Sequence, residues 1–96
     1  MDDATDDADG HVVSMPIDGV LDLHIFQPRE VKHLVPDYIE ECRARGILEV
    51  RIIHGKGTGV LRNAIHNMLK RQPNVKNYRL GKYGEGEDGV TIVTLK

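Results

Sequence analysis

The chain has 96 residues and a formal net charge of −2 at pH 7, a length that fits one domain and excludes two. Its 40% hydrophobic and 29% charged residues suit a soluble cytoplasmic protein, and no apolar run approaches the ~20 residues that a membrane-spanning helix needs. The single cysteine, Cys42, excludes an internal disulfide and a cysteine-based zinc site, and the first ten residues show no targeting signal.

The chain begins with an acidic segment. Residues 1–14 contain five Asp and no Lys or Arg, and such a composition cannot bury enough apolar surface to order itself. We therefore predict a disordered acidic tail over residues 1–14 and one folded domain over residues 15–96. The folded part holds 13 basic against 10 acidic residues and is mildly basic. The tail would serve solubility, or it would compete with phosphates for the basic face of the domain.

The first strand is predicted over residues 20–25, where apolar and polar residues alternate. This alternation places Leu21 and Leu23 on the core face. Asp22 and His24 then lie on the opposite face, at the carboxyl end of the strand.

A helix is predicted after this strand. Pro28 stands at a favourable first helical position, although Gln27 before it is a poor cap. Apolar residues then recur at helical spacing as far as Cys42, and Gly46 marks the end. Pro36 lies inside this pattern and predicts a kink, or a helix whose main body begins near it.

The remaining elements are predicted from the spacing at which apolar residues repeat. We predict a strand over residues 48–54, a helix over 61–71 and two further strands over 77–80 and 90–95. The order β-α-β-α-β-β predicts an α/β two-layer sandwich, with two helices on one face of a four-stranded mixed sheet. The other face is then partly open. Alternation places four polar side chains there: Asp22, His24, Arg51 and Arg79.

Polar residues also stand where two parallel strands end. Asp22 and His24 end the first strand and His54 ends the second, so neighbouring strands would bring both imidazoles into one site. Two imidazoles that titrate near neutrality can act as base and acid on a phosphodiester. The same three residues are an alternative, weaker ligand set for a divalent cation such as Mg²⁺, and no cofactor is certain. The other histidines are expected to be solvated: His11, His33 and His66.

The segment HGKGTG leads directly from strand to helix. Glycines at alternate positions let the backbone approach a ligand, and free N–H groups at a helix start attract an anion. The spacing is neither a Walker A loop nor a dinucleotide fingerprint, so the alternatives are a phosphate site and a plain tight connection. The predicted phosphate-binding or nucleic-acid-binding residues are Gly55, Lys56, Gly57, Thr58, Gly59 and Arg62, with Arg51, Arg79 and Tyr83 beyond the turn. Phe26 and Tyr83 would either stack on bases or pack at the edge of the site.

Three segments together resemble a known family. LDLH at 21–24, VRIIHGKGTGVLR at 50–62 and GVTIVTL at 89–95 are similar to the small MutS-related (Smr) domain, over roughly residues 17–96. The resemblance implies a two-layer α/β sandwich that binds DNA or RNA and, in several members, an endonuclease. Smr domains occur at the end of larger proteins and alone, and this chain resembles the stand-alone kind.

The resemblance also implies site residues. The family's LDxH element falls on Asp22 and His24, and its HGxG element on residues 54–57. One departure is that Ile25-Phe26 stands where the family usually has glycine.

Two functional hypotheses follow. The first is a nucleic-acid-binding domain with endonuclease activity, in which Asp22 orients a histidine while His24 and His54 serve as acid and base. The second is a non-catalytic adaptor that binds nucleic acid or protein, favoured by the scarcity of aromatic residues and by Ile25-Phe26. DNA versus RNA, the need for a metal and the oligomeric state stay open at this point.

Overall fold

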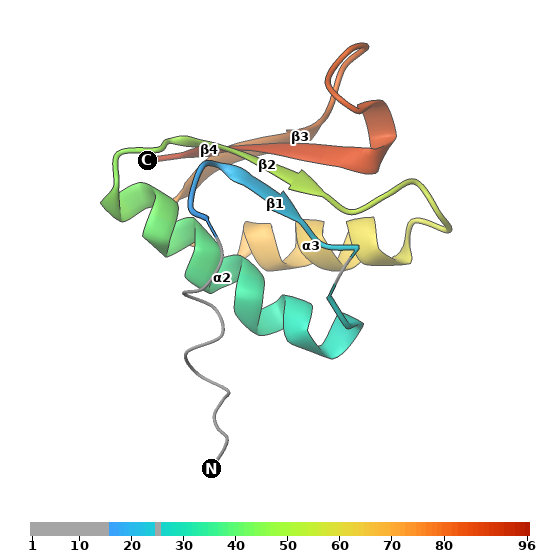
Figure 1. Cartoon of the computed structure of the whole chain (residues 1–96), viewed down its shortest axis with the longest axis horizontal. Coiled ribbons are helices and arrows are strands. Elements are labelled where there is room, and N and C mark those ends of the chain that lie inside the picture. The colour runs from blue at the N-terminus through green and yellow to red at the C-terminus, as the bar shows by residue number, and fades with distance from the viewer. Residues whose placement is uncertain (1–15, 25) are drawn as a thin grey trace.

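The computed structural model of the chain describes residues 16–24 and 26–96 (Figure 1). The predicted acidic tail lies outside these residues. In chain order the elements are β1 (Val20–Asp22), α2 (Pro28–Ala44), β2 (Glu49–Ile53), α3 (Val60–Lys70), β3 (Val75–Leu80), the short 3-10 helix η2 (Glu87–Gly89) and β4 (Val90–Leu95). No helix within the described part of the chain is long and apolar enough to cross a lipid bilayer.

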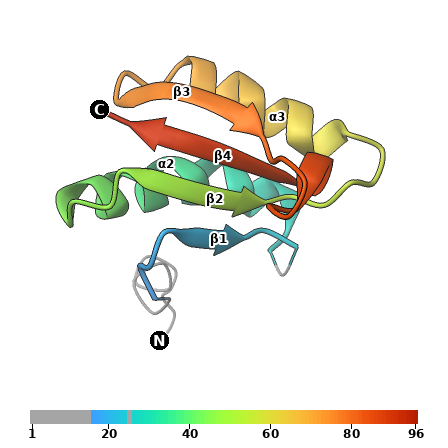
Figure 2. The ribbon, with the colours of Figure 1, turned by 90° about the horizontal axis from the view of Figure 1, so that it is seen from above.

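The four strands form one mixed sheet in the order β1-β2-β4-β3. β1 and β2 are parallel, as a strand–helix–strand unit requires, while β4 runs antiparallel to both β2 and β3. Both helices cover the same face of the sheet (Figures 1 and 2). The predicted two-layer α/β sandwich is therefore confirmed.

The core lies between the sheet and the helices. Alternate residues of the strands point into it, and helical residues at three- and four-residue spacing meet them. Its completely buried members include Leu21, Leu23, Val50, Ile52 and Val93 from the sheet side and Val35, Tyr38, Ile39, Cys42 and Ile65 from the helices. Cys42 is a buried thiol whose pKa is raised by burial.

Helix α2 begins at Pro28, and the Glu30 carboxylate accepts a hydrogen bond from the Gln27 N–H at 2.8 Å. This contact compensates for the weak cap predicted at Gln27. The helix then continues through Pro36 to Ala44, so its main body does not begin at the proline. The first strand is shorter than predicted and ends at Asp22, which leaves His24 in the turn that follows.

Tyr38 joins α2 to the start of β1. Its hydroxyl accepts a hydrogen bond from the Gly19 N–H at 3.1 Å and donates one to the Val20 carbonyl at 3.0 Å. Burial raises the pKa of Tyr38 to about 12, so this hydroxyl keeps its proton.

We predict that Tyr38→Phe lowers the free energy of unfolding by about 1–3 kcal/mol, because it leaves the buried Gly19 N–H and the part-buried Val20 carbonyl without their partner. The measurement is urea denaturation followed by circular dichroism. Tyr83→Phe is the matched control, since Tyr83 is 94% exposed. Equal effects of the two substitutions would contradict this role of the Tyr38 hydroxyl.

Candidate functional site

Three segments of the chain meet at one edge of the sheet. Asp22 of β1 pairs with Ile53 of β2, and the Leu23 N–H donates to the Ile53 carbonyl at 2.9 Å, so the two strands end side by side (Figure 2). The loop between β3 and β4 returns to the same edge. The carbonyl of Gly89 in this loop accepts hydrogen bonds from the N–H groups of His54 (3.0 Å) and Gly55 (2.9 Å).

The turn after β2 has a backbone that favours glycine. Gly55, Gly57 and Gly59 have φ values of +82°, +33° and +86°, which residues with a Cβ rarely adopt. Gly59 is the N-cap of α3, and no side-chain hydrogen bond from it caps the helix. N–H groups at the start of an uncapped helix attract anions. The phosphate site that the sequence predicted at this turn stays a prediction.

Arg62 folds back over this turn from the first turn of α3. A Cβ placed on Gly59 would stand 2.5 Å from Nη2 of Arg62, so the guanidinium lies directly against the glycine. Thr58 caps the helix weakly, because the Val60 N–H donates to its hydroxyl over a long 3.4 Å. Arg62 and the glycine turn are thus brought together, as the sequence predicted.

A cavity of about 540 Å³ lies beside the turn, between the turn and the two helices. Its apolar wall includes Val31 from α2 and Leu61, Ala64 and Met68 from α3. Its charged lining residues are three cations, Lys32, Lys56 and Arg62, and no Asp or Glu is among the described residues that line it. Sequence reasoning missed Lys32, because its position on the exposed side of a helical stripe carries no functional signal.

His54 is a buried histidine at the end of β2, only 6% exposed. Its Nδ1 lies 3.0 Å from the Gly55 carbonyl, which only accepts, so Nδ1 carries the proton and donates. In the neutral ring Nε2 is then an acceptor, and the Thr91 hydroxyl donates to it at 2.8 Å. His66 Nε2, also 2.8 Å from that hydroxyl, donates to its oxygen. The result is a hydrogen-bond chain from His66 through Thr91 and His54 to Gly55.

The surroundings of His54 favour its neutral form. Burial lowers the pKa of His54, and the nearby Arg62 cation lowers it further. Both ring nitrogens of His54 have protein partners, the Gly55 carbonyl and the Thr91 hydroxyl.

The expectation that His66 is solvated is wrong. His66 is half-buried, its ring centroid lies 4.8 Å from that of Tyr78, and burial lowers its pKa. The sequence held a signal for the burial of His66, because His66 borders the apolar stripe three residues before Leu69. Thr91 alternates with Val93 on the core face of its strand, a pattern that indicates its burial but not its contact with His54.

Asp22 and His24 form a separate, exposed pair. The Asp22 carboxylate accepts from the His24 backbone N–H at 3.1 Å and pairs with Nδ1 of the same residue. The His24 side chain is 71% exposed. Because Leu23 points into the core, alternation directs Asp22 away from the helices, whereas His54 faces Thr91 and α3. The two strand ends meet, with the Asp22–His24 pair exposed and the His54 imidazole buried against Thr91.

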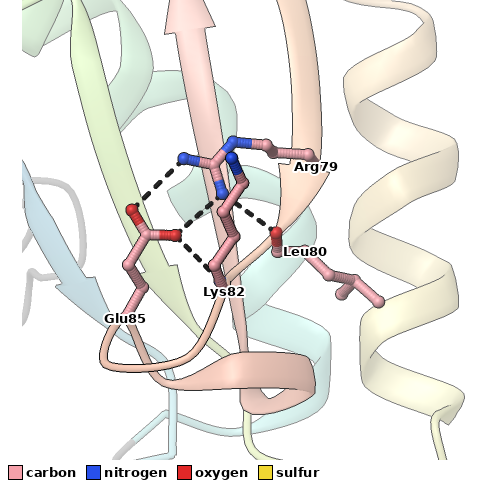
Figure 3. Close-up of polar contacts among 4 residues, drawn as sticks. All are labelled: Arg79, Leu80, Lys82 and Glu85. Carbon is pink, nitrogen blue, oxygen red and sulfur yellow. Dashed lines mark hydrogen bonds and ion pairs between the residues drawn. The ribbon is translucent and has the colours of Figure 1, made fainter.

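Arg51 and Arg79 lie on the sheet face that the helices leave open, on one rung with Ile92 between them. Arg79 donates to both oxygens of Glu85, at 2.8 and 3.2 Å, and to the Leu80 carbonyl at 3.2 Å (Figure 3). This contact, with a further hydrogen bond from the Lys82 N–H, lowers the pKa of Glu85 to about 2. The charge of Arg79 is therefore already paired within the protein.

The other predicted residues are placed as follows. Lys56 is exposed, with Nζ 3.5 Å from Glu87 and 3.8 Å from Asp88, which are loose surface ion pairs. Tyr83 is 94% exposed in the β3–β4 loop, and Phe26 packs half-buried against the core. Within residues 16–24 and 26–96 no three His, Cys, Asp or Glu side chains form a group that could hold a metal ion, so Asp22, His24 and His54 do not fit the alternative Mg²⁺ site.

Comparison with known proteins gives consistent results. The Smr domain family matches residues 21–96. Endonuclease MutS2 of Clostridium novyi is 54% identical over 76 residues, and that of Clostridium tetani 50% over 80; they cover 79% and 83% of this chain. The chain spans about 10% of the length of these relatives.

Two solved structures share the fold. The crystal structure of the Smr domain of Thermus thermophilus MutS2 matches with a TM-score of 0.76 at 40% identity, covering 80% of this chain and 96% of that one. YdaL, a stand-alone small MutS-related protein from Escherichia coli, matches with a TM-score of 0.76 at 26% identity, covering 81% and 64%.

We predict that Thr91→Val lowers the free energy of unfolding by about 1–3 kcal/mol, because it removes the hydroxyl between two histidine nitrogens while keeping the side-chain volume. Thr94→Val on the same strand is the control and should stay within about 0.5 kcal/mol of the parent, since Thr94 lies on the open face. Urea denaturation near pH 7.5 measures both. A Thr91 variant as stable as the control would contradict the role of the Thr91 hydroxyl in the hydrogen-bond chain.

Stability should also depend on pH through His54 and His66. Because their pKa values are lowered in the folded protein, the unfolded chain takes up protons first as the pH falls below 6.5. The contribution of the two histidines to the free energy of unfolding should therefore be greatest above pH 6.5. It should decrease below that pH until the pKa values of the folded protein are reached. Urea denaturation from pH 8 to 5 measures this slope.

His66→Gln should reduce that slope, because one of the two groups no longer titrates. The matched control is His33→Gln, at an exposed position of α2. If the slope changes equally in the two variants, burial of His66 does not cause the pH dependence.

Proposed function

The chain belongs to the Smr domain family, and on this premise we propose that it binds nucleic acid through the phosphate groups and cleaves the phosphodiester backbone. The observation that carries the proposal is the lining of the cavity beside the glycine turn: three cations and no carboxylate, next to an uncapped helix start. The relatives named endonuclease MutS2 support cleavage as the reaction.

Binding would begin at the turn. A phosphate oxygen can approach the backbone at Gly57, where the space that a Cβ would take is open, and Lys56 and Arg62 supply compensating charge. The His54 side chain supports this geometry from behind, since it donates to the Gly55 carbonyl. The hydrogen bonds to the Gly89 carbonyl fix the start of the turn to the neighbouring loop.

Cleavage would depend on the exposed pair at the end of β1. Asp22 holds Nδ1 of His24, which leaves Nε2 for proton transfer to or from a substrate oxygen. His54 is not proposed as the second acid or base, because both its nitrogens are occupied and its pKa is lowered. This revises the predicted division of roles: His24 transfers the proton and His54 positions the turn.

The second candidate function is binding without cleavage. The observation that favours it is the same occupation of both His54 nitrogens, because acid–base cleavage of a phosphodiester needs two groups and only one imidazole is exposed at this edge. In that case the turn and its cations would serve an adaptor.

Binding is tested by titrating labelled single- and double-stranded DNA and RNA at several salt concentrations. Contacts to ~3 phosphates should give a slope of log affinity against log salt near −3. Lys56→Ala should weaken binding to every sequence about equally and make the slope shallower by roughly one. Lys76→Ala, at an exposed position of β3, is the matched control. Binding that ignores salt would contradict phosphate recognition.

Cleavage is tested on the same substrates, with and without a chelator. His24→Ala should slow cleavage by ~10²–10⁴, the usual size of a lost general acid or base, while His33→Ala should cleave like the parent. Sparing of 2′-deoxy substrates would identify the 2′-hydroxyl as the nucleophile. A parent protein that binds every substrate and cleaves none leaves the binding module as the function.

A further inference from the structure

We propose that the cavity between α2 and α3 receives one unpaired nucleobase, whose phosphate lies on the glycine turn. The preferred ligand is then a single strand, or a duplex with a locally unpaired nucleotide. This inference rests on the proposed function and deepens it, because it states which form of nucleic acid the site selects.

The first observation is the shape and chemistry of the cavity. Its volume of about 540 Å³ falls within the range of small-molecule sites, and Val31, Leu61, Ala64 and Met68 give it an apolar wall. A phosphate held at the turn makes no use of such a wall. A flat group with apolar faces does, because it displaces water from the surface that these side chains expose.

The second observation is the charge around this wall. Lys32 lies on the α2 side of the cavity, Lys56 in the turn and Arg62 on the α3 side, with no acidic side chain among the described lining residues. Lys56 has loose ion pairs with Glu87 and Asp88, but a purely apolar segment of a protein would offer no anion to Lys32 and Arg62. A ligand that joins a flat, largely apolar group to an anion satisfies both features, and a nucleotide unit of a nucleic acid is such a ligand.

Base pairing decides the form of the ligand. In a continuous duplex each base is stacked on both faces and its phosphate points outward, so a phosphate on the turn would leave the cavity empty. A base can enter only after it has left the stack, and this costs nothing in an unstructured single strand and least at a mismatched or damaged position in a duplex. The site should therefore bind single strands more tightly than duplexes of the same charge.

The test compares two oligonucleotides with equal numbers of phosphates: a ten-nucleotide deoxyadenosine strand and a ten-nucleotide strand in which every base is absent. The parent protein should bind the adenosine strand about tenfold more tightly, as expected when one base gains apolar contact with protein. It should also prefer that strand to the same strand in a duplex.

Ala64→Leu tests the cavity itself. Ala64 is exposed on α3, and leucine is a good helix former that would fill the space beside Met68. The ratio of the two affinities should fall to near one. The matched control is Asn67→Leu, an exposed position on the same helix outside the cavity lining, which should keep the tenfold ratio.

A measurement on the parent protein does not depend on how the variant folds. Adenosine monophosphate should shift the NMR signals of the Met68 methyl group and of the turn glycines, whereas inorganic phosphate should shift only the glycines. If the Met68 signal does not shift when adenosine monophosphate is added, the base site is overturned.

The outcomes separate this inference from the function on which it rests. Equal, salt-dependent binding of the two strands overturns the base site and leaves phosphate binding standing. Failure of both strands to bind at low salt overturns both proposals. A short acidic peptide that binds in the cavity more tightly than the adenosine strand would reassign it to a protein partner.

Discussion

The hydrogen-bond chain from His66 through Thr91 to His54 is the constraint on which the rest of the site depends. It joins three elements, α3, β4 and the end of β2, and it ends on the Gly55 carbonyl inside the glycine turn. Each atom in it has one role, because the Gly55 carbonyl only accepts and the Thr91 hydroxyl has one proton. With His54 neutral, Thr91 donates to its Nε2 and His66 donates to the Thr91 oxygen. Ordering a turn rich in glycine costs much conformational entropy. The hydrogen bonds from His66 to Gly55 stabilise the turn in one conformation against this cost.

The same constraint separates two histidines that look alike in the sequence. His54 is buried, its pKa is lowered, and both its ring nitrogens have protein partners. His24 is exposed and paired with Asp22. Their strands are adjacent, but His24 lies in the exposed turn after β1, whereas His54 is buried against Thr91. The chemistry proposed for this edge therefore divides into a binding side, formed by the turn and its cavity, and a proton-transfer side, formed by Asp22 and His24.

Charge is also divided between the two faces. On the helix side Lys32, Lys56 and Arg62 surround a cavity without carboxylates among its described lining residues. On the open face of the sheet Arg79 is bound by Glu85. A phosphate would have to displace Glu85 to reach Arg79, whereas at the turn it meets backbone N–H groups and cations directly. This contrast is why the proposals place the nucleic acid at the turn and not across the sheet.

The sequence by itself determined the architecture and the position of the turn. Helical and strand periods, with a glycine-rich segment after the second strand, sufficed to predict the two-layer sandwich and the glycine turn before α3, because both depend on residues close together in the chain. Only the tertiary structure decided which histidine side chain is exposed and which is buried. Thr91 meets His54 across 37 residues because β4 pairs with β2, and His66 reaches the same hydroxyl from α3. Such contacts join side chains whose separation in sequence carries no period, so no local pattern could predict them.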